Sequence, residues 1–225
     1  MFIVIEGLDG AGKSTQVKKI KNYMAENGYQ TEYLHFPRFT APVYGELIAR
    51  FLRGELGSVE QVDPQIVALL YAGDRSLASS MIRGWIEDGR VVIVDRYVYS
   101  NIAYQCAKIK DVYKRNELKK WILSLEYDHN MIPRPDMSLF LDVPFSFTQQ
   151  KLAEQRNGDD RSYLCGVKDI HESSLSLQDN VRQIYIESAV SDPLFKVIDC
   201  SAQGQMASPE QIFSRIQAEI DMILR

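Results

Sequence analysis

Residues 7–15, GLDGAGKST, constrain the fold of this chain more than any other part of its sequence. They satisfy the pattern G-x-x-x-x-G-K-[ST], in which a glycine-rich loop joins a strand to a helix and surrounds phosphate groups. The required context is present, because the apolar run 2–6 precedes the loop and a stretch with helical spacing follows it. The alternative, a glycine-rich turn with a chance lysine, does not account for this context. The sequence therefore predicts a nucleoside triphosphate site, with Lys13 on the phosphates and the hydroxyl of Ser14 on Mg²⁺.

Short apolar runs alternate with longer helical patterns along the chain. We expect strands at residues 2–6, 32–36, 91–94, 138–142 and 196–199. A long helix should begin at Pro64 with Asp63 as its N-cap, and a last helix should cover about 209–224. This alternation predicts an α/β fold, a five-stranded parallel sheet with helices on both faces. Because no repeat or linker divides the chain, residues 1–225 are expected to form one domain.

The overall charge and the cysteine content exclude several classes of protein. A net charge of −4 argues against a protein that binds a nucleic acid polymer. Three widely spaced cysteines suggest neither a disulfide framework nor a metal site. The three histidines (His35, His129 and His171) are also widely spaced and are expected at the surface. No apolar run is long enough to span a membrane and no export signal is evident, so a cytoplasmic location is expected.

Two arginines follow predicted strands and therefore belong at the same edge of the sheet as the glycine-rich loop. Arg38 follows the second strand and Arg96 follows the third. Ligands of open parallel sheets bind at this edge, and the planar guanidinium group suits a phosphate. Surface ion pairs are the alternative for each arginine, but together they favour an acceptor that already carries a phosphate. Asp95 could hold Mg²⁺ through water, orient Arg96, or cap the next helix.

Polar and aromatic pairs with helical spacing could recognise a nucleobase. Tyr71 and Arg75 are four residues apart on the long helix, and Asn101 and Gln105 share the same spacing. A ring can stack on a base, while guanidinium and amide groups bond to its edge. The alternative is that Tyr71 and Arg75 only cover an edge of the core.

Five segments together resemble the thymidylate kinase family over nearly the whole chain. They are EGLDGAGKSTQ, FPRF, LLYAGDR, DRYVYSNIAYQ and PDMSLFLDV. The resemblance implies the P-loop kinase fold and a site for ATP formed by Gly7, Leu8, Asp9, Gly10, Ala11, Gly12, Lys13, Ser14 and Thr15. It implies that dTMP binds to Asp9, Phe36, Arg38, Tyr71, Arg75, Arg96, Ser100, Asn101, Tyr104 and Gln105. In these roles Asp9 contacts the sugar 3′-hydroxyl, Arg38 and Arg96 hold the acceptor phosphate, Tyr71 stacks on thymine, and Tyr104 lies against the sugar. Ser14 and Asp95 would hold Mg²⁺, the latter through water.

The polar segment of residues 154–172 resembles the mobile lid of that family. Gly10 stands where some members have an arginine in the phosphate loop. Members without that arginine supply the positive charge from the lid, which here points to Arg156 and Arg161, with Lys168 in reserve. With Lys13, Asp95 and Arg96, these two arginines complete the expected catalytic set. Solvated loop charges are the alternative for the lid residues.

The expected activity is transfer of the ATP γ-phosphate to dTMP, giving dTDP and ADP, in a homodimer that the resemblance implies. A kinase for another pyrimidine nucleotide or for a deoxynucleoside is the nearest alternative. A GTP-dependent switch would carry an N-K-x-D motif after a later strand, and the sequence has none. A P-loop protein that binds ATP without turnover is disfavoured by the intact Lys13 and Ser14 together with the arginines.

Overall fold

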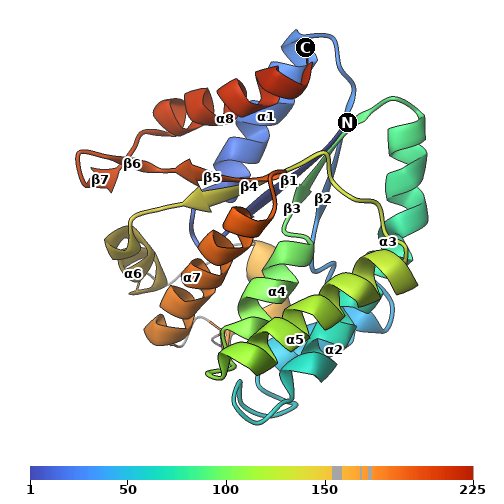
Figure 1. The fold of residues 1–225 in the computed structure, drawn as a ribbon, viewed down its shortest axis with the longest axis vertical. Coiled ribbons are helices and arrows are strands. Elements are labelled where there is room, and N and C mark those ends of the chain that lie inside the picture. The colour runs from blue at the N-terminus through green and yellow to red at the C-terminus, as the bar shows by residue number, and fades with distance from the viewer. Residues whose placement is uncertain (154–158, 168, 172–173, 225) are drawn as a thin grey trace.

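Five parallel strands form the central sheet of the computed structural model, in the order β2-β3-β1-β4-β5 (Figure 1). β1 (Phe2–Gly7) lies in the middle, between β3 (Val91–Asp95) and β4 (Met137–Asp142). β2 (Thr31–His35) and β5 (Phe195–Asp199) form the two edges. The five strands predicted from the sequence are confirmed, each within one residue of its expected bounds.

The structure describes residues 1–153, 159–167, 169–171 and 174–224, and these contain eight α-helices. The helices are α1 (Lys13–Glu26), α2 (Tyr44–Leu52), α3 (Pro64–Glu87), α4 (Val98–Cys106), α5 (Val112–Leu123), α6 (Phe145–Ala153), α7 (Leu175–Ser191) and α8 (Pro209–Leu224). A π-helical turn (Ser124–His129) continues α5, and a 3₁₀ turn (Asp159–Leu164) follows α6. None of the described helices is long and apolar enough to cross a membrane.

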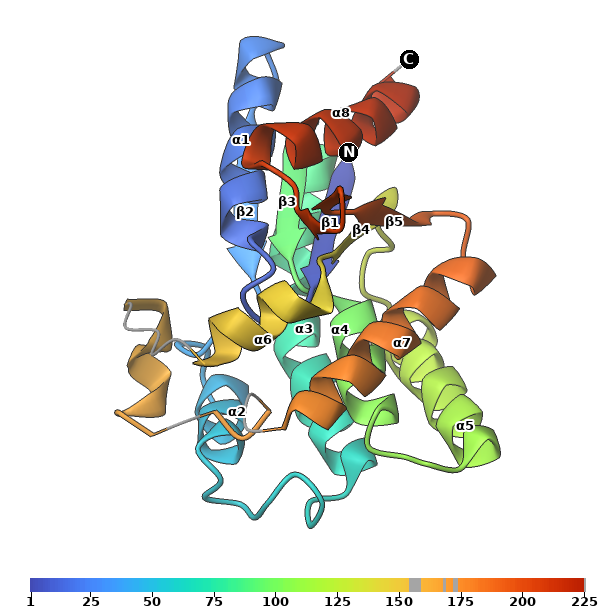
Figure 2. The ribbon, with the colours of Figure 1, turned by 90° about the vertical axis from the view of Figure 1, so that its left-hand side faces the viewer.

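The two faces of the sheet bury different side chains because successive residues of a strand point to opposite sides. Ile3 and Ile5 of β1 pack with α1 and α8 on one face. Phe2 and Val4 pack with α3, α4 and α7 on the other. Figure 2 shows α1 and α8 on one side of the strands and α4, α5 and α7 on the opposite side. The predicted coverage of both faces is confirmed.

The start of α3 follows the sequence signal for a helix N-terminus. The carboxylate of Asp63 accepts a hydrogen bond from the backbone N–H of Gln65, and Pro64 occupies the first helical turn. A two-stranded hairpin after β5, formed by β6 (Ser201–Ala202) and β7 (Gln205–Met206), was not predicted. Two-residue strands carry too little periodicity to be recognised from sequence.

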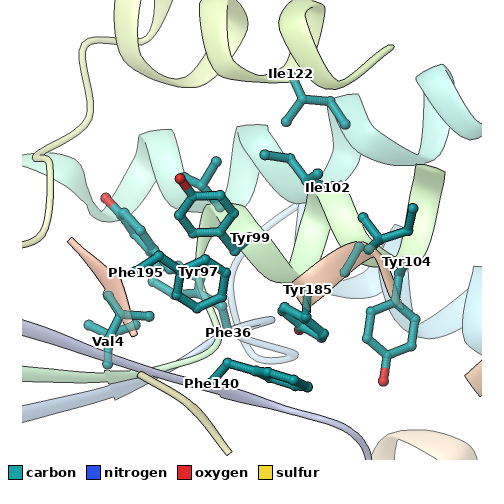
Figure 3. Packing of buried hydrophobic residues seen from close by; sticks show 14 of the residues in the cluster. Val4, Phe36, Tyr97, Tyr99, Ile102, Tyr104, Ile122, Phe140, Tyr185 and Phe195 are labelled. Atoms are coloured by element: carbon teal, nitrogen blue, oxygen red, sulfur yellow. The ribbon is translucent and has the colours of Figure 1, made fainter. Parts of the chain in front are cut away.

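Aromatic residues stack within the larger core and extend it toward the edge where the strands end. Tyr99 is stacked on Phe195 with ring centroids 4.2 Å apart, and Tyr185 on Phe140 at 4.5 Å. Figure 3 shows Tyr104 at the margin of this cluster, with its hydroxyl group pointing away from the other rings. The core therefore supports side chains whose polar ends lie outside it.

Candidate active site

A cavity of about 720 Å³ lies beyond the carboxyl ends of β1, β2 and β3. Its wall contains residues from the loops after these strands, from α3 and α4, and from the segment 162–171. Both its position and its volume are usual for the ligand site of an open parallel sheet.

The glycine-rich loop forms one end of the cavity. Gly12, with φ of 80°, is the N-cap of α1, a backbone conformation that favours glycine. A Cβ atom on Gly7 would lie 3.2 Å from the Cβ of Ala11, so the loop is closely folded on itself. The first N–H groups of α1 and the positive end of its dipole therefore stand at the cavity, where an anion is stabilised.

Lys13 is buried beneath this loop. Its Nζ donates to the backbone carbonyl oxygens of Gly7 (3.4 Å) and Leu8 (3.1 Å). Burial, together with the positive charge of Arg96, lowers the pKa of Lys13 to about 8 against the opposing effect of Asp95 and Asp9. An added phosphate would bring negative charge to this amine and stabilise its ammonium form.

Arg96 lies opposite, at the end of β3, and its backbone has φ of 66°. This left-handed conformation is uncommon for a residue other than glycine and is typical of functional sites. Its guanidinium group donates to Asp9 (2.7 Å), to the hydroxyl of Ser100 (3.3 Å) and to that of Tyr104 (3.4 Å). Tyr104 in turn donates to Asp9 at 2.8 Å. The group is thus held in one position in the wall of the cavity.

Glu6, a buried residue of β1, supports this arrangement and was not predicted. Its carboxylate accepts hydrogen bonds from the backbone N–H groups of Tyr97 (3.0 Å) and Ser100 (3.2 Å), and from the hydroxyl of Tyr185 (3.1 Å). The hydroxyl of Ser100 also donates to it. Burial raises the pKa of Glu6, partly offset by these hydrogen bonds and by Arg96. Glu6 therefore fixes the start of α4 and positions Ser100, one of the hydrogen-bond partners of Arg96.

Asp95, at the end of β3, places a second carboxylate beside that of Asp9 in the wall of the cavity. Its Oδ1 is buried and has no hydrogen-bond partner among the described residues. His35 lies opposite it in the β2–β3 register, and burial lowers the pKa of that histidine. No group of three or more His, Cys, Asp or Glu in the described part of the chain could enclose a metal ion. One carboxylate and the hydroxyl of Ser14 instead fit Mg²⁺, which keeps several waters and is held largely by substrate phosphates.

Arg38 differs from Arg96 in its surroundings. Its Nε donates to Oδ1 of Asp74 (2.9 Å) and its Nη2 to the backbone carbonyl of Asp74 (2.8 Å). The neighbouring Pro37 and Phe39 line the cavity, whereas Arg38 is not among the lining residues. The two arginines expected at a common edge are therefore unequal, since only Arg96 lines the cavity with Lys13.

The far end of the cavity is formed by polar groups of α3 and α4. Tyr71 and Arg75 both line it, and Arg75 is buried in an ion pair with Glu126 of the π-helical turn. Asn101 donates to the carbonyl oxygen of Ala68 (3.0 Å) and to Glu126 (3.2 Å). In the described residues its Oδ1 has no partner, and neither has Nε2 of Gln105. These groups are suited to a ligand with hydrogen-bonding atoms of both kinds.

Part of the predicted lid closes one side of the cavity. Tyr163 stacks on Phe39 with ring centroids 3.6 Å apart, and its hydroxyl donates to Asp169 at 3.0 Å. His171 is buried and lies 5.1 Å from the ring of Tyr104, between centroids. The expectation that all three histidines lie at the surface was therefore wrong for His171, whose pKa burial lowers well below its ordinary value.

Most of the predicted site residues meet in this cavity. Its lining includes Asp9, Gly10, Ala11, Gly12, Lys13, Ser14, Phe36, Tyr71, Arg75, Asp95, Arg96, Ser100, Asn101, Tyr104 and Gln105. Gly7, Leu8 and Thr15 belong to the loop without lining the cavity. Arg156 and Lys168 lie outside the described residues, and Arg161 belongs to the 3₁₀ turn.

The sequence interpretation missed several lining residues, among them Tyr33, His35, Phe39, Tyr163, Asp169 and His171. A period of two along β2 places Tyr33 and His35 on one face of the strand, so this signal was available for both. For the last three, no periodicity in the polar segment indicated which side chains turn inward.

Comparison with known proteins identifies the family. The family model for thymidylate kinase matches residues 5–210. A probable thymidylate kinase of Thermococcus kodakarensis is 31% identical, over 100% of this chain and 98% of its own. A thymidylate kinase of Mycobacterium tuberculosis is 32% identical, over 84% of this chain and 86% of its own. The structure of thymidylate kinase from Candida albicans superposes with a TM-score of 0.74 and 25% identity, over 98% of this chain and 91% of that one. The chain belongs to the thymidylate kinase family.

Proposed function

We propose that this cavity carries out the reaction of the family, transfer of the ATP γ-phosphate to dTMP, through the residues described above. The observation that carries this assignment is the facing arrangement of two cationic groups. Lys13 and the glycine-rich loop stand at one end, and Arg96 stands opposite, beside Asp9. Two separate anions, one on the donor and one on the acceptor, would occupy such a site. A nucleoside lacks the second anion and would leave Arg96 without a phosphate.

The donor would bind through the loop of residues 7–15. Its N–H groups hold the β- and γ-phosphates, and Lys13 exchanges its two carbonyl contacts for phosphate oxygens. Ser14 and, through water, Asp95 would hold Mg²⁺, and the unpartnered Oδ1 of Asp95 supports this role. The bound ion would neutralise charge on the phosphates and orient them.

Three side chains would recognise the base of dTMP, in the order hydrogen-bond donor, acceptor and donor. Nη1 of Arg75 and Nε2 of Gln105 are donors, and Oδ1 of Asn101 is an acceptor. Thymine presents the complementary order along one edge, O4 as acceptor, N3–H as donor and O2 as acceptor. Cytosine has an amino group and a bare ring nitrogen at the first two places, which would leave buried groups unpaired. Tyr71 would stack on the ring.

Arg96 would hold the acceptor phosphate while the γ-phosphoryl group moves toward it. Arginine has five N–H donors, and contacts with the described residues use three. Arg38 would help to hold the same phosphate while remaining paired with Asp74. Asp9 would contact the sugar 3′-hydroxyl beside Tyr104. Closure of the lid would exclude water and bring Arg156 or Arg161 to the transferring group.

We further propose that the whole chain works as one unit in a cytoplasmic homodimer. Apolar side chains of α3 support the second part: Ile66, Leu69, Leu77 and Met81 are 38–55% exposed. Their spacing of three, four or eight residues places them on one face of the helix. A second copy of this chain would cover that face.

The assignment is tested by measuring ADP release with ATP and magnesium while each acceptor is offered in turn. We expect dTMP to be the best acceptor among dTMP, dUMP, dCMP, dAMP and dGMP, and free thymidine to be inert. The physical reason is that dTMP supplies both the phosphate for Arg96 and the complete base edge, which thymidine, dCMP, dAMP and dGMP do not; dUMP presents the same edge and lacks only the 5-methyl group. A preference for thymidine or for dCMP would contradict the proposal.

A further inference from the structure

Lys108 lies behind the part of the cavity wall that Arg75, Asn101 and Gln105 form, and it contacts Gln105. It follows the last turn of α4, and its Nζ donates to Oε1 of Gln105 at 2.7 Å. Gln105 is 1% exposed and lines the cavity, whereas Lys108 lines a second cavity of about 590 Å³ on the other side. Gln105 therefore connects the lysine to the acceptor site by a direct hydrogen bond.

The chemistry of an ammonium group decides which way the Gln105 amide faces. Lysine in its charged form has three donors and no acceptor, so only the carbonyl oxygen of the amide can bond to it. The amide nitrogen must then lie on the other side, and Nε2 has no partner among the described residues. The Asn101 amide, one turn earlier, has the opposite orientation. The carbonyl of Ala68 and the carboxylate of Glu126 both accept from its Nδ2, so its oxygen is the atom left available to a ligand.

We propose that Lys108 is a positioning residue that sets the polarity of acceptor recognition by holding the Gln105 amide with its nitrogen available to the base. The acceptor must then present a carbonyl oxygen to Gln105. This inference rests on the proposed function, since it takes the nucleobase to lie against Gln105. Without the ammonium group the amide could turn by half a rotation and place its oxygen against the carbonyl of the base, which is repulsive.

The surroundings of Lys108 make this device sensitive to pH near neutrality. Its Nζ lies 4.9 Å from the centre of the Phe51 ring. The titratable groups around it are Glu60, Lys110, Asp111 and Lys114 of the second cavity, together with His171, whose ring also packs against Phe51. Burial lowers the pKa of Lys108 to about 7, and Glu60 opposes this shift.

The direction of the pH effect on dTMP binding follows from the protonation state of Lys108 that favours recognition of the base. Below pH 7 the ammonium form dominates and the amide is fixed. As the pH rises through 7 the neutral amine, which can also accept a hydrogen bond, no longer excludes the other amide orientation. dTMP selects the fixed orientation and should therefore bind less tightly as the pH rises.

The experiment is titration of the protein with dTMP in the absence of ATP, from pH 6.5 to 8.5, using the wild type, Lys108→Arg and Lys108→Met. The phosphate of dTMP is largely dianionic over this range. We expect the wild-type Kd to rise about fivefold, the value of one hydrogen bond. Lys108→Arg, always charged, should keep the low Kd throughout, and Lys108→Met should show the high Kd at every pH. At saturating dTMP, kcat should change less than twofold.

Lys110→Met is the matched control, because it removes a cation from the second cavity without contacting Gln105. It should reproduce the wild-type profile. A second control adds Lys108→Met to Gln105→Ala, where we expect no further loss of affinity. Equal pH profiles for the wild type and Lys108→Arg, or a Lys108→Met variant with the wild-type Kd at pH 6.5, would overturn the inference. Failure of dTMP to bind the wild type at any pH would instead contradict the proposed function.

Discussion

At the scale of single residues, the clearest indication of function is where polar atoms are left without partners. Buried polar groups without hydrogen bonds are uncommon because each destabilises the folded state. Of the seven buried side-chain atoms without a partner in the described residues, four belong to residues that line the cavity. These four are Oδ1 of Asp95, Oδ1 of Asn101, Nε2 of Gln105 and Nε2 of His171. Such concentration at one place indicates that the missing partners are supplied by ligands.

Replacement of Arg96 tests its assignment to the acceptor phosphate. We expect Arg96→Ala to lower kcat by about 10²- to 10³-fold, because charge developing on the phosphoryl group loses its counterpart. ATP affinity, measured by nucleotide titration, should change less than about threefold, since the loop of residues 7–15 is intact. The control is Arg115→Ala, which removes an arginine that pairs with Glu187 at 3.6 Å and does not line the cavity. An equal loss of ATP binding and turnover in Arg96→Ala would place this residue on the donor side.

Residue identities could be predicted from the sequence where a local pattern fixes their position. Lys13 follows from the loop motif, and Arg96 from its place at the end of β3. Glu6 could not be predicted, because within an apolar run nothing distinguishes a buried carboxylate that organises a helix start from an exposed one. His171 and Tyr163 turn inward through contacts with α2, α4 and Phe39, which are distant in sequence.

At the scale of elements, one ion pair connects α3 with the π-helical turn that continues α5. Arg75 is paired with Glu126, and both are buried. Glu126 also accepts from Asn101 of α4, so three elements meet at one carboxylate. The cavity wall formed by Arg75, Asn101 and Gln105 therefore depends on a residue that does not itself line the cavity.

Glu126→Ala is expected to destabilise the protein strongly, because it leaves the guanidinium group of Arg75 buried without its counter-charge. The free energy of unfolding in urea should fall by about 3–5 kcal/mol. Asp128→Ala, in the same turn, removes an exposed partner of Arg134 (3.7 Å) and should change this free energy by less than about 0.5 kcal/mol. Similar values for the two variants would show that the buried pair does not hold these elements together.

Elements with a strong period or a clear end signal could be predicted, and the others could not. The five strands and the start of α3 at Asp63 and Pro64 agree with the structure. The π-helical turn was not predicted, because its sequence differs little from that of an ordinary helix. The short 3₁₀ turn of the lid similarly depends on tertiary contacts, such as that between Arg53 and the carbonyl oxygen of Tyr163 (2.7 Å).

At the scale of the whole molecule, the sheet separates two tasks. One face, covered by α1 and α8, is the apolar core that supports the glycine-rich loop, whose Ala11 belongs to it. The other, covered by α3, α4 and α7, continues into the polar wall of the cavity, because Tyr104 lies at the margin of this core (Figure 3) and also lines the cavity. α3 therefore has three different sides, one in the core, one toward the cavity and one outward.

The outward side of α3 is where a second copy of the chain should bind. Leu77 is 54% exposed and lies between Ile66 and Met81 on the apolar face. Leu77→Glu would bury an uncompensated carboxylate at such an interface, which strongly disfavours association. By sedimentation equilibrium we expect the wild type at twice the mass of the chain and Leu77→Glu shifted to the single chain. Val190→Glu on α7, a position 87% exposed, should remain dimeric.

A wild-type mass equal to one chain at micromolar concentration would contradict the dimer, and an unchanged mass for Leu77→Glu would move the interface to another face. Since this face belongs to the helix that carries Tyr71 and Arg75, loss of the dimer should also raise the KM for dTMP more than that for ATP.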